Sequence, residues 1–515
     1  MRLRPSHVRE PIPNAVGAGS GPPSRRRAAR APMAVVLTGL ALLALPACWT
    51  VPGGGPGGPP PDIAADLSQE LTGGNGPFIG AAVTVDLAQA GYVEHEYAAA
   101  GTASSYRAVG GLPQDGRWTF EPDGSASYRT RVLVRRPAQA AEFSGTVIVE
   151  WLNVSGGVDA DPEWANLHEE ITRQGHVWVG VSAQQIGVIG GQVLVQAPGP
   201  GSELAGKGLK AIDPARYGSL AHPGDGFSFD ILSQVARGLR AGAALDGLQP
   251  RRLVAAGESQ SAFAMVTYYN GVQPITAAFD GFYVHSRGAS ALPLVGPGQG
   301  ADLTGALLSS PTTFRTDQTA PVFDVQTESD LTGILNSSKA RQPDSDRFRL
   351  WEVAGTAHAD AHLLGANAAS IDCGVPINNG PLHLVAKAAL RGLTDWLETG
   401  RAPVTGPRVE LTEGLLPGVR RDADGIALGG VRTPPVDVPI DVLSGDPGPK
   451  LSTICLLLGS TTPLPADRVA ELYPTRAAYQ QRYGTSADKT VEAGFVLRED
   501  RAALLDFAEP ERVTG

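Results

Sequence analysis

Cysteine is scarce in this sequence: the 515-residue chain contains three. So few cysteines exclude a disulfide-rich scaffold and a cysteine-rich zinc module. A surplus of positive charge is also absent, because the net charge is −10 at pH 7. This balance argues against a sequence-independent nucleic-acid binder, which needs a basic face. The apolar run at residues 33–45 is too short to span a bilayer, which takes about 20 residues.

The composition is that of a folded protein. Hydrophobic residues make up 42% of the chain, which excludes wholesale disorder. The length allows a large core, and it suits one big α/β domain with extensions as well as two domains.

The first 48 residues have the features of an export signal. Clustered arginines at residues 25–30 precede the apolar run, and Leu45-Pro46-Ala47-Cys48 follows it. This ending resembles a bacterial lipobox, in which the cysteine is lipidated, so Cys48 is the predicted lipidation site. Pro46 is unusual there, and cleavage by an ordinary signal peptidase with plain secretion is the alternative. We therefore expect an exported protein, either a cell-envelope lipoprotein or a secreted one.

A Gly/Pro-rich segment follows the signal. The sequence VPGGGPGGPPP at residues 51–61 cannot bury a core, so residues 49–75 are predicted to form a tether. The catalytic core is predicted to occupy residues 76–404. Residues 405–515 are predicted to be a C-terminal extension packed on that core within the same domain.

The body of the chain alternates between strand and helix patterns. Strands are predicted at residues 128–135, 145–153, 176–182, 252–256, 277–284, 322–326 and 348–353. Helices are predicted at residues 161–173, 229–244, 261–269 and 382–398. This alternation predicts an α/β fold with a mostly parallel central sheet and helices on both faces.

The pentapeptide Gly257-Glu258-Ser259-Gln260-Ser261 lies between a predicted strand and a predicted helix. This context is typical of a nucleophile elbow, a sharp turn that projects a serine hydroxyl above the sheet. Ser259 is the candidate nucleophile. Ser261 stands where glycine is commoner, but serine is also small enough for strand and helix to approach.

Partners for the serine follow in the order Ser, acid, His. Asp330 and Glu328 both lie just after the predicted strand at residues 322–326, and either carboxylate could orient an imidazole; we favour Asp330. His358 follows the strand at residues 348–353 and is the predicted general base. His358, Asp360 and His362 lack a further ligand motif nearby, so no metal site is predicted.

Acyl transfer also needs hydrogen-bond donors for an oxyanion. The backbone N–H of Gln260 would supply one donor, and the loop that begins with Asn153 and Val154 would supply another. Arg287 follows the strand at residues 277–284 and is a candidate for the substrate pocket, where it would hold a substrate carboxylate. We favour the alternative, in which Arg287 pairs with a carboxylate of the protein such as Glu328.

Two cysteines remain if Cys48 is lipidated. In an oxidising compartment Cys373 and Cys455 could form a disulfide that ties the C-terminal region to the core. Two free buried thiols are the equally supported alternative.

The chain from about residue 80 onward resembles the bacterial family named "alpha/beta hydrolase domain-containing protein". The matching stretches are VIVEWLNVSGG at 147–157, DPARYGSLAHPGD at 213–225, GESQSA at 257–262, TESD at 327–330, GTAHAD at 355–360 and GGVRTPPVDVP at 429–439. The resemblance implies the α/β-hydrolase fold and a triad of Ser259, Asp330 or Glu328, and His358. Members of this family are exported serine hydrolases, so the resemblance implies such an activity for this chain but no particular substrate.

The function expected from these residues is hydrolysis of a carboxylic ester through an acyl-enzyme intermediate. The reaction requires no metal or organic cofactor. The expected partner is a small-molecule ester, with no nucleic acid, and the membrane is involved only through a lipid anchor at the N-terminus. The alternatives are another acyl-transfer or lyase chemistry on the same fold, and a catalytically silent ligand-binding lipoprotein.

Overall fold

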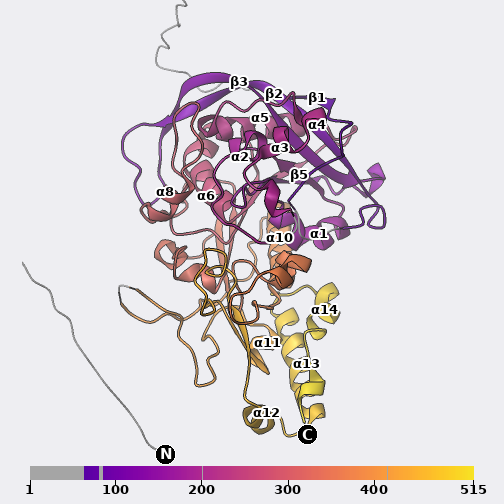
Figure 1. Cartoon of the computed structure of the whole chain (residues 1–515), viewed down its shortest axis with the longest axis vertical. Coiled ribbons are helices and arrows are strands. Elements are labelled where there is room, and N and C mark those ends of the chain that lie inside the picture. Colours follow the sequence, from indigo (N-terminus) through magenta and orange to yellow (C-terminus); the bar gives the residue numbers. More distant parts are fainter. Residues whose placement is uncertain (1–62, 81–84, 200, 415, 515) are drawn as a thin grey trace, which may run out of the picture. The chain divides into compact units, whose positions relative to one another are not determined.

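The computed structural model describes residues 63–80, 85–199, 201–414 and 416–514 (Figure 1). The expected export signal, with Cys48, lies outside the described residues, as does the first part of the expected tether. The tether prediction extends too far, because Asp66–Glu70 forms a strand that pairs with the next strand. Leu67 of this strand is buried in the main core, which a tether cannot do.

A nine-stranded sheet forms the centre of the fold, in the order β1-β2-β3-β5-β4-β6-β7-β8-β9. The strands are β1 (Asp66–Glu70), β2 (Tyr92–Ala108), β3 (Phe120–Pro137), β4 (Thr146–Trp151), β5 (Val177–Val181), β6 (Arg252–Glu258), β7 (Gly281–His285), β8 (Val322–Thr327) and β9 (Phe348–Val353). The first three pair antiparallel, and β3 also pairs antiparallel with β5. All pairs from β5 through β9 are parallel. The loops that follow these parallel strands therefore meet at one edge of the sheet.

Helices cover both faces of the sheet, as predicted. The α-helices are α1 (Pro162–Arg173), α2 (Gln185–Ile189), α3 (Gly208–Ile212), α4 (Pro214–Tyr217), α5 (Ser228–Arg240), α6 (Gln260–Thr267), α7 (Gln273–Thr276), α8 (Leu303–Leu308), α9 (Ala361–Leu364), α10 (Leu382–Thr399), α11 (Pro434–Asp437), α12 (Ala466–Leu472), α13 (Arg476–Glu492) and α14 (Arg501–Leu505). Among the described residues, none of these helices combines the length and apolar character that crossing a bilayer would take.

Alternation along the central strands divides the core into two layers. Val147 and Val149 of β4 pack with α5 and α6 on one face, whereas Ile148 packs with α1 and α10 on the other. Every residue of β4 and β5 is buried, which explains why these strands read as nearly continuous apolar runs.

The C-terminal extension packs directly on the core. Its Phe495 meets Trp351 of β9 edge to face, with ring centroids 5.0 Å apart. The backbone N–H of Val431 donates to the carbonyl of Glu352 at 2.7 Å. Lys387 of α10 pairs with Asp500 at 3.0 Å. All of these residues belong to one compact unit that spans Pro56–Gly515.

Cys373 and Cys455 form a disulfide with Cα atoms 5.5 Å apart, which is one of the two alternatives that the sequence left open. The bond joins segments 82 residues apart. It fixes the segment around Cys455 beside the loop that follows α9, next to the site described below.

Candidate active site

Ser259 occupies the sharp turn between β6 and α6. Its backbone has φ 58° and ψ −122°, a strained conformation for a residue with a side chain. Gly257 permits this turn, because a Cβ there would lie 2.9 Å from the backbone of Ser261. The N–H of Ser259 donates to the carbonyl of His285 at the end of β7, at 3.0 Å. The neighbouring strand thus holds the turn in place.

His358 connects the serine to a carboxylate. The Nε2 of His358 lies 2.8 Å from the Oγ of Ser259, and its Nδ1 lies 2.7 Å from Oδ1 of Asp330. Asp330 follows β8 and His358 follows β9, so adjacent parallel strands deliver both side chains to the same edge. Burial alone would raise the pKa of Asp330, but the charge of His358 and hydrogen bonds from His358 and Thr327 lower it. The ionised carboxylate therefore faces the imidazole.

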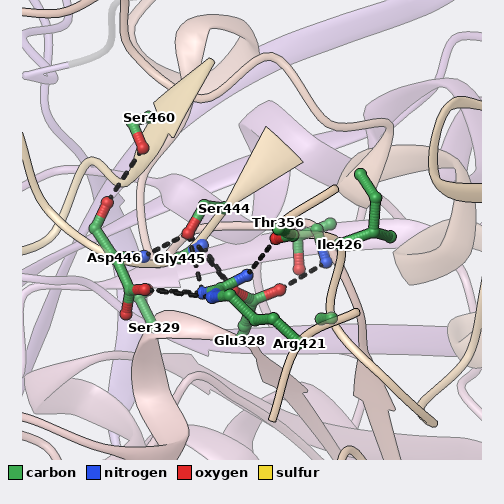
Figure 2. Close-up of polar contacts among 12 residues, drawn as sticks. Glu328, Ser329, Thr356, Arg421, Ile426, Ser444, Gly445, Asp446 and Ser460 are labelled. Carbon is green, nitrogen blue, oxygen red and sulfur yellow. Dashed lines mark hydrogen bonds and ion pairs between the residues drawn. The ribbon is translucent and has the colours of Figure 1, made fainter. Parts of the chain in front are cut away.

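Glu328, the alternative acid, points to the C-terminal extension instead (Figure 2). Its Oε2 accepts from the N–H of Gly355 at 2.8 Å, and its Oε1 accepts from the N–H of Gly445 at 2.9 Å. Arg421 forms an ion pair with Glu328 and also binds Asp446 at 2.7 Å. Glu328 therefore joins the extension to the loop that carries His358, rather than touching the imidazole.

The candidate oxyanion donors divide into two groups. Gln260 opens α6, where its N–H has no acceptor within the helix, and it lines the pocket beside Ser259. The prediction that Asn153 supplies an oxyanion donor is wrong, because its N–H donates to the carbonyl of Ala160 at 2.9 Å. Its side-chain amide donates to the carbonyl of Glu258 at 3.1 Å, which braces the elbow. Val154 is fully buried behind the loop and lines neither pocket at Ser259.

Ser155 is the residue of this loop that lines both pockets that meet at Ser259. The sequence pattern points to the glycines that follow Ser155 and not to Ser155 itself. The side-chain oxygen of Asn153 accepts from the N–H of Ser155 at 2.8 Å, which turns the loop toward Ser259.

Arg287 pairs with a protein carboxylate, which was the favoured of its two alternatives, and it lines neither pocket at Ser259. Its Nε donates to Asp324 of β8 at 2.9 Å, and its NH1 and NH2 donate to the carbonyls of Thr312 and Ala340. The side chain is 2% exposed. The guanidinium is thus committed to a protein carboxylate, although that carboxylate is not Glu328.

Glu258 is the functional neighbour that sequence reasoning missed. Its Oε1 lies 3.4 Å from Nε2 of His358, on the side of the imidazole that faces Ser259. Burial raises the pKa of Glu258 to about 7, against the lowering effect of His358 and His285. Its position just before the nucleophile, at the end of a buried strand, was the signal in the sequence.

Further ionisable groups lie beneath this site. Burial alone would lower the pKa of His285, but Glu163, 3.4 Å from its Nδ1, and Glu258 raise it to about 9. Burial would also lower the pKa of His358, but the negative charges of Glu258 and Asp330 raise it. Two carboxylates therefore raise the pKa of the imidazole that contacts Ser259.

His362, four residues after His358, faces away from Ser259. Its ring stacks on His383 with centroids 3.7 Å apart, and its Nε2 lies 3.3 Å from the carbonyl of Ala165. Asp360 caps α9 by accepting from the N–H of Leu363 at 2.8 Å. Over the part of the chain that the structure describes, no three His, Cys, Asp or Glu side chains gather as they would around a metal ion.

Two pockets meet at Ser259. The α8 pocket is apolar and has Phe263, Leu292, Leu303, Leu307, Leu335 and Leu457 among its lining residues. The His358 pocket is more polar and has Glu258, His358, Asp161, Gly156, Leu363 and Leu364 among its lining residues. An apolar cavity and convergent polar groups at one serine are the usual features of a small-molecule site.

Comparison with known proteins agrees with this architecture. The family model described as "Alpha/beta hydrolase domain" matches residues 60–506. A serine hydrolase without a lid from Xanthomonas campestris is 14% identical, with 58% of this chain and 94% of that chain covered and a TM-score of 0.29. An esterase from Rhizomucor miehei is 12% identical, with 58% and 86% covered and a TM-score of 0.30. The TM-scores of these two structures are too low to carry an argument, and the agreement rests on the family model. No curated protein matches the chain.

A pair of substitutions separates the two acids. Asp330→Asn should lower turnover by about 10⁴, because the amide cannot hold His358 in the tautomer that accepts a proton from Ser259. Glu328→Gln should leave turnover within a few-fold but lower the free energy of unfolding by about 1–3 kcal/mol, because it removes the charge that Arg421 faces. Ester turnover and urea unfolding of both variants check this. Near-normal turnover in Asp330→Asn together with a crippled Glu328→Gln would reverse the two roles.

A second prediction concerns pH. The base form of His358 is neutral, and the negative charge of Glu258 favours the protonated form. Glu258→Gln should therefore lower the pKa of His358 and move the acid limb of kcat/KM to lower pH. Asp360→Asn is the matched control: it also neutralises a buried carboxylate whose pKa is raised, to about 6, but one that does not contact His358. An unmoved limb in Glu258→Gln, or an equal shift in both variants, would contradict the interaction.

Proposed function

The chain belongs to the alpha/beta hydrolase domain family, as its motifs predicted, and on this premise we propose that it is a serine hydrolase of carboxylic esters. The observation that carries the proposal is the hydrogen-bonded chain from Ser259 through His358 to Asp330. A hydroxyl bonded to an imidazole, which is oriented by a buried carboxylate, is the arrangement that activates a serine.

In the acylation step, His358 Nε2 accepts the proton of Ser259 as the Oγ attacks the ester carbonyl carbon. The bond from Oγ to carbon forms, and the carbonyl oxygen becomes an oxyanion beside the N–H of Gln260. The bond from carbon to the alcohol oxygen then breaks, and His358 returns the proton to that oxygen. The alcohol leaves, and the acyl group remains on Ser259.

Deacylation repeats the same sequence with water. His358 accepts a proton from water as the water oxygen attacks the acyl carbon, and the bond to Ser259 Oγ breaks. The proton passes to Oγ, and the carboxylic acid is released. Asp330 stays ionised throughout and stabilises the imidazolium that forms twice in each cycle.

Removal of the nucleophile is the direct test. Ser259→Ala should lower hydrolysis of p-nitrophenyl esters by on the order of 10⁶-fold, and it should abolish labelling by a fluorophosphonate, because it removes the hydroxyl that contacts the imidazole Nε2 of His358. Ser261→Ala is the matched control, since that buried serine accepts from Gln260 and does not contact His358. Retention of turnover and labelling in Ser259→Ala would refute the proposed function.

The proposed location of the protein rests on a separate feature, the lipobox-like ending at Cys48. We expect lipidation of Cys48, since a basic flank, an apolar run and a Gly/Pro tether surround it, and the disulfide suits an oxidising compartment. Expressed in a bacterium, the full chain should fractionate with membranes and require detergent for release. Cys48→Ala should make it soluble. Wild-type protein found wholly in the medium, with an unmodified N-terminus, would instead indicate plain secretion.

A further inference from the structure

The two pockets at Ser259 differ in size and in chemistry. The α8 pocket has a volume of about 50 Å³, compared with about 210 Å³ for the His358 pocket. Hydrophobic side chains from α6, α8 and the loops near them make up most of the α8 pocket, whereas His358, Glu258 and Asp161 line the other. Both pockets share Ser155, Val195, Ser259 and Leu457. A substrate bonded to Ser259 can therefore place one group in each.

The geometry of the reaction decides which group goes where. The alcohol oxygen receives its proton from His358 Nε2, so the alcohol part of the ester lies on the side of His358. The oxyanion faces the N–H of Gln260. The remaining substituent of the tetrahedral carbon is the acyl chain, and the space left for it is the α8 pocket, which Ser259 and Gln260 line and His358 does not.

We propose that the α8 pocket binds the acyl chain and that Leu307, Ile334 and Leu335 at its end restrict the protein to esters of short, apolar acids. This proposal rests on the proposed ester hydrolysis. The same three residues also line a separate groove, together with Leu308, Pro311 and Lys339. They form a wall with the acyl pocket on one side and the groove on the other.

The wall is thin and partly exposed. Leu335 is 6% exposed, whereas Ile334 is 39% exposed and Leu308, the neighbour of Leu307, is 84% exposed. Removing a side chain from this wall therefore joins the α8 pocket to the groove rather than leaving a sealed void. Leu307 is half-buried at the end of α8, so its truncation should not prevent folding.

The segment around Leu457 makes up another side of the pocket. Leu457 comes from the C-terminal extension, and its carbonyl accepts from the N–H of Ala359, next to His358, at 3.2 Å. The disulfide at Cys455 holds this segment two residues away. The short acyl pocket is therefore closed by groups from the core and from the extension.

The test compares Leu307→Ala with Leu363→Ala, a matched truncation in the His358 pocket. In the wild type, kcat/KM for p-nitrophenyl esters should fall steeply from butanoate to octanoate. Leu307→Ala should raise the octanoate-to-acetate ratio by roughly tenfold or more, since one methylene in an apolar pocket is worth about that factor. Leu307→Phe should lower the butanoate-to-acetate ratio. Leu363→Ala should change selectivity among acetates of different alcohols and leave the acyl preference unchanged.

Labelling by p-nitrophenyl alkylphosphonates separates this proposal from ester hydrolysis itself, because the alkyl group takes the place of the acyl chain without turnover. Labelling by long-chain phosphonates that improves only in Leu307→Ala supports the assignment of the acyl pocket. If the protein labels in this way but hydrolyses no ester, only the proposed function is refuted. A Leu307→Ala variant that alters alcohol selectivity instead, or equal chain-length effects in Leu307→Ala and Leu363→Ala, would overturn it. Failure of Ser259 to label with any phosphonate would overturn both proposals.

Discussion

The positive φ of Ser259 is the constraint on which the rest of the site depends. Such a conformation costs on the order of 1–3 kcal/mol for a residue with a Cβ, and it persists only where the surroundings fix it. Here β6 is hydrogen-bonded on both sides, to β4 and β7, and the N–H of Ser259 is held by the carbonyl of His285. The parallel sheet thus stabilises a turn that the chain would not adopt alone, and the turn is what exposes the hydroxyl to His358.

The electrostatics of the site follow from the same geometry. Because β6, β8 and β9 end at one edge, Glu258, Asp330 and His358 converge in a buried region, where burial favours the uncharged form of each group. Glu258 responds with a raised pKa, while Asp330 keeps its charge because His358 and Thr327 hydrogen-bond to it. One carboxylate can therefore orient the imidazole as a permanent anion, while the other titrates near neutrality.

The sequence predicted the parts of the fold that depend on local pattern. The apolar runs of β4 and β5 were found because those strands are buried on both faces. β2 was missed because its small and polar residues, AAAGTASS among them, resemble a loop, and only pairing with β3 along its length makes it a strand. β7 begins at Gly281 rather than at residue 277, since Ala277 has φ 45° and ends α7.

Pairing between side chains that are far apart in the chain could not be predicted from the sequence. Asp330 and Glu328 are two residues apart, and spacing alone could only favour one of them. What separates them in space is Arg421, 93 residues after Glu328, which draws that carboxylate toward the extension. Asn153 was correctly placed beside the elbow, but its N–H is occupied by Ala160, a bond that no pattern of residue types reveals.

The C-terminal extension is part of the site rather than an addition to a finished core. Glu328 binds both Gly355, three residues before His358, and Gly445 of the extension, so one carboxylate fixes the position of two segments. Leu457 reaches Ser259 from the same extension and lines both pockets. The core supplies the serine, the acid and the imidazole, and the extension supplies part of the lining around them. The shape of the pockets, and hence the selectivity of the site, depends on contacts between segments about 100 residues apart in the chain.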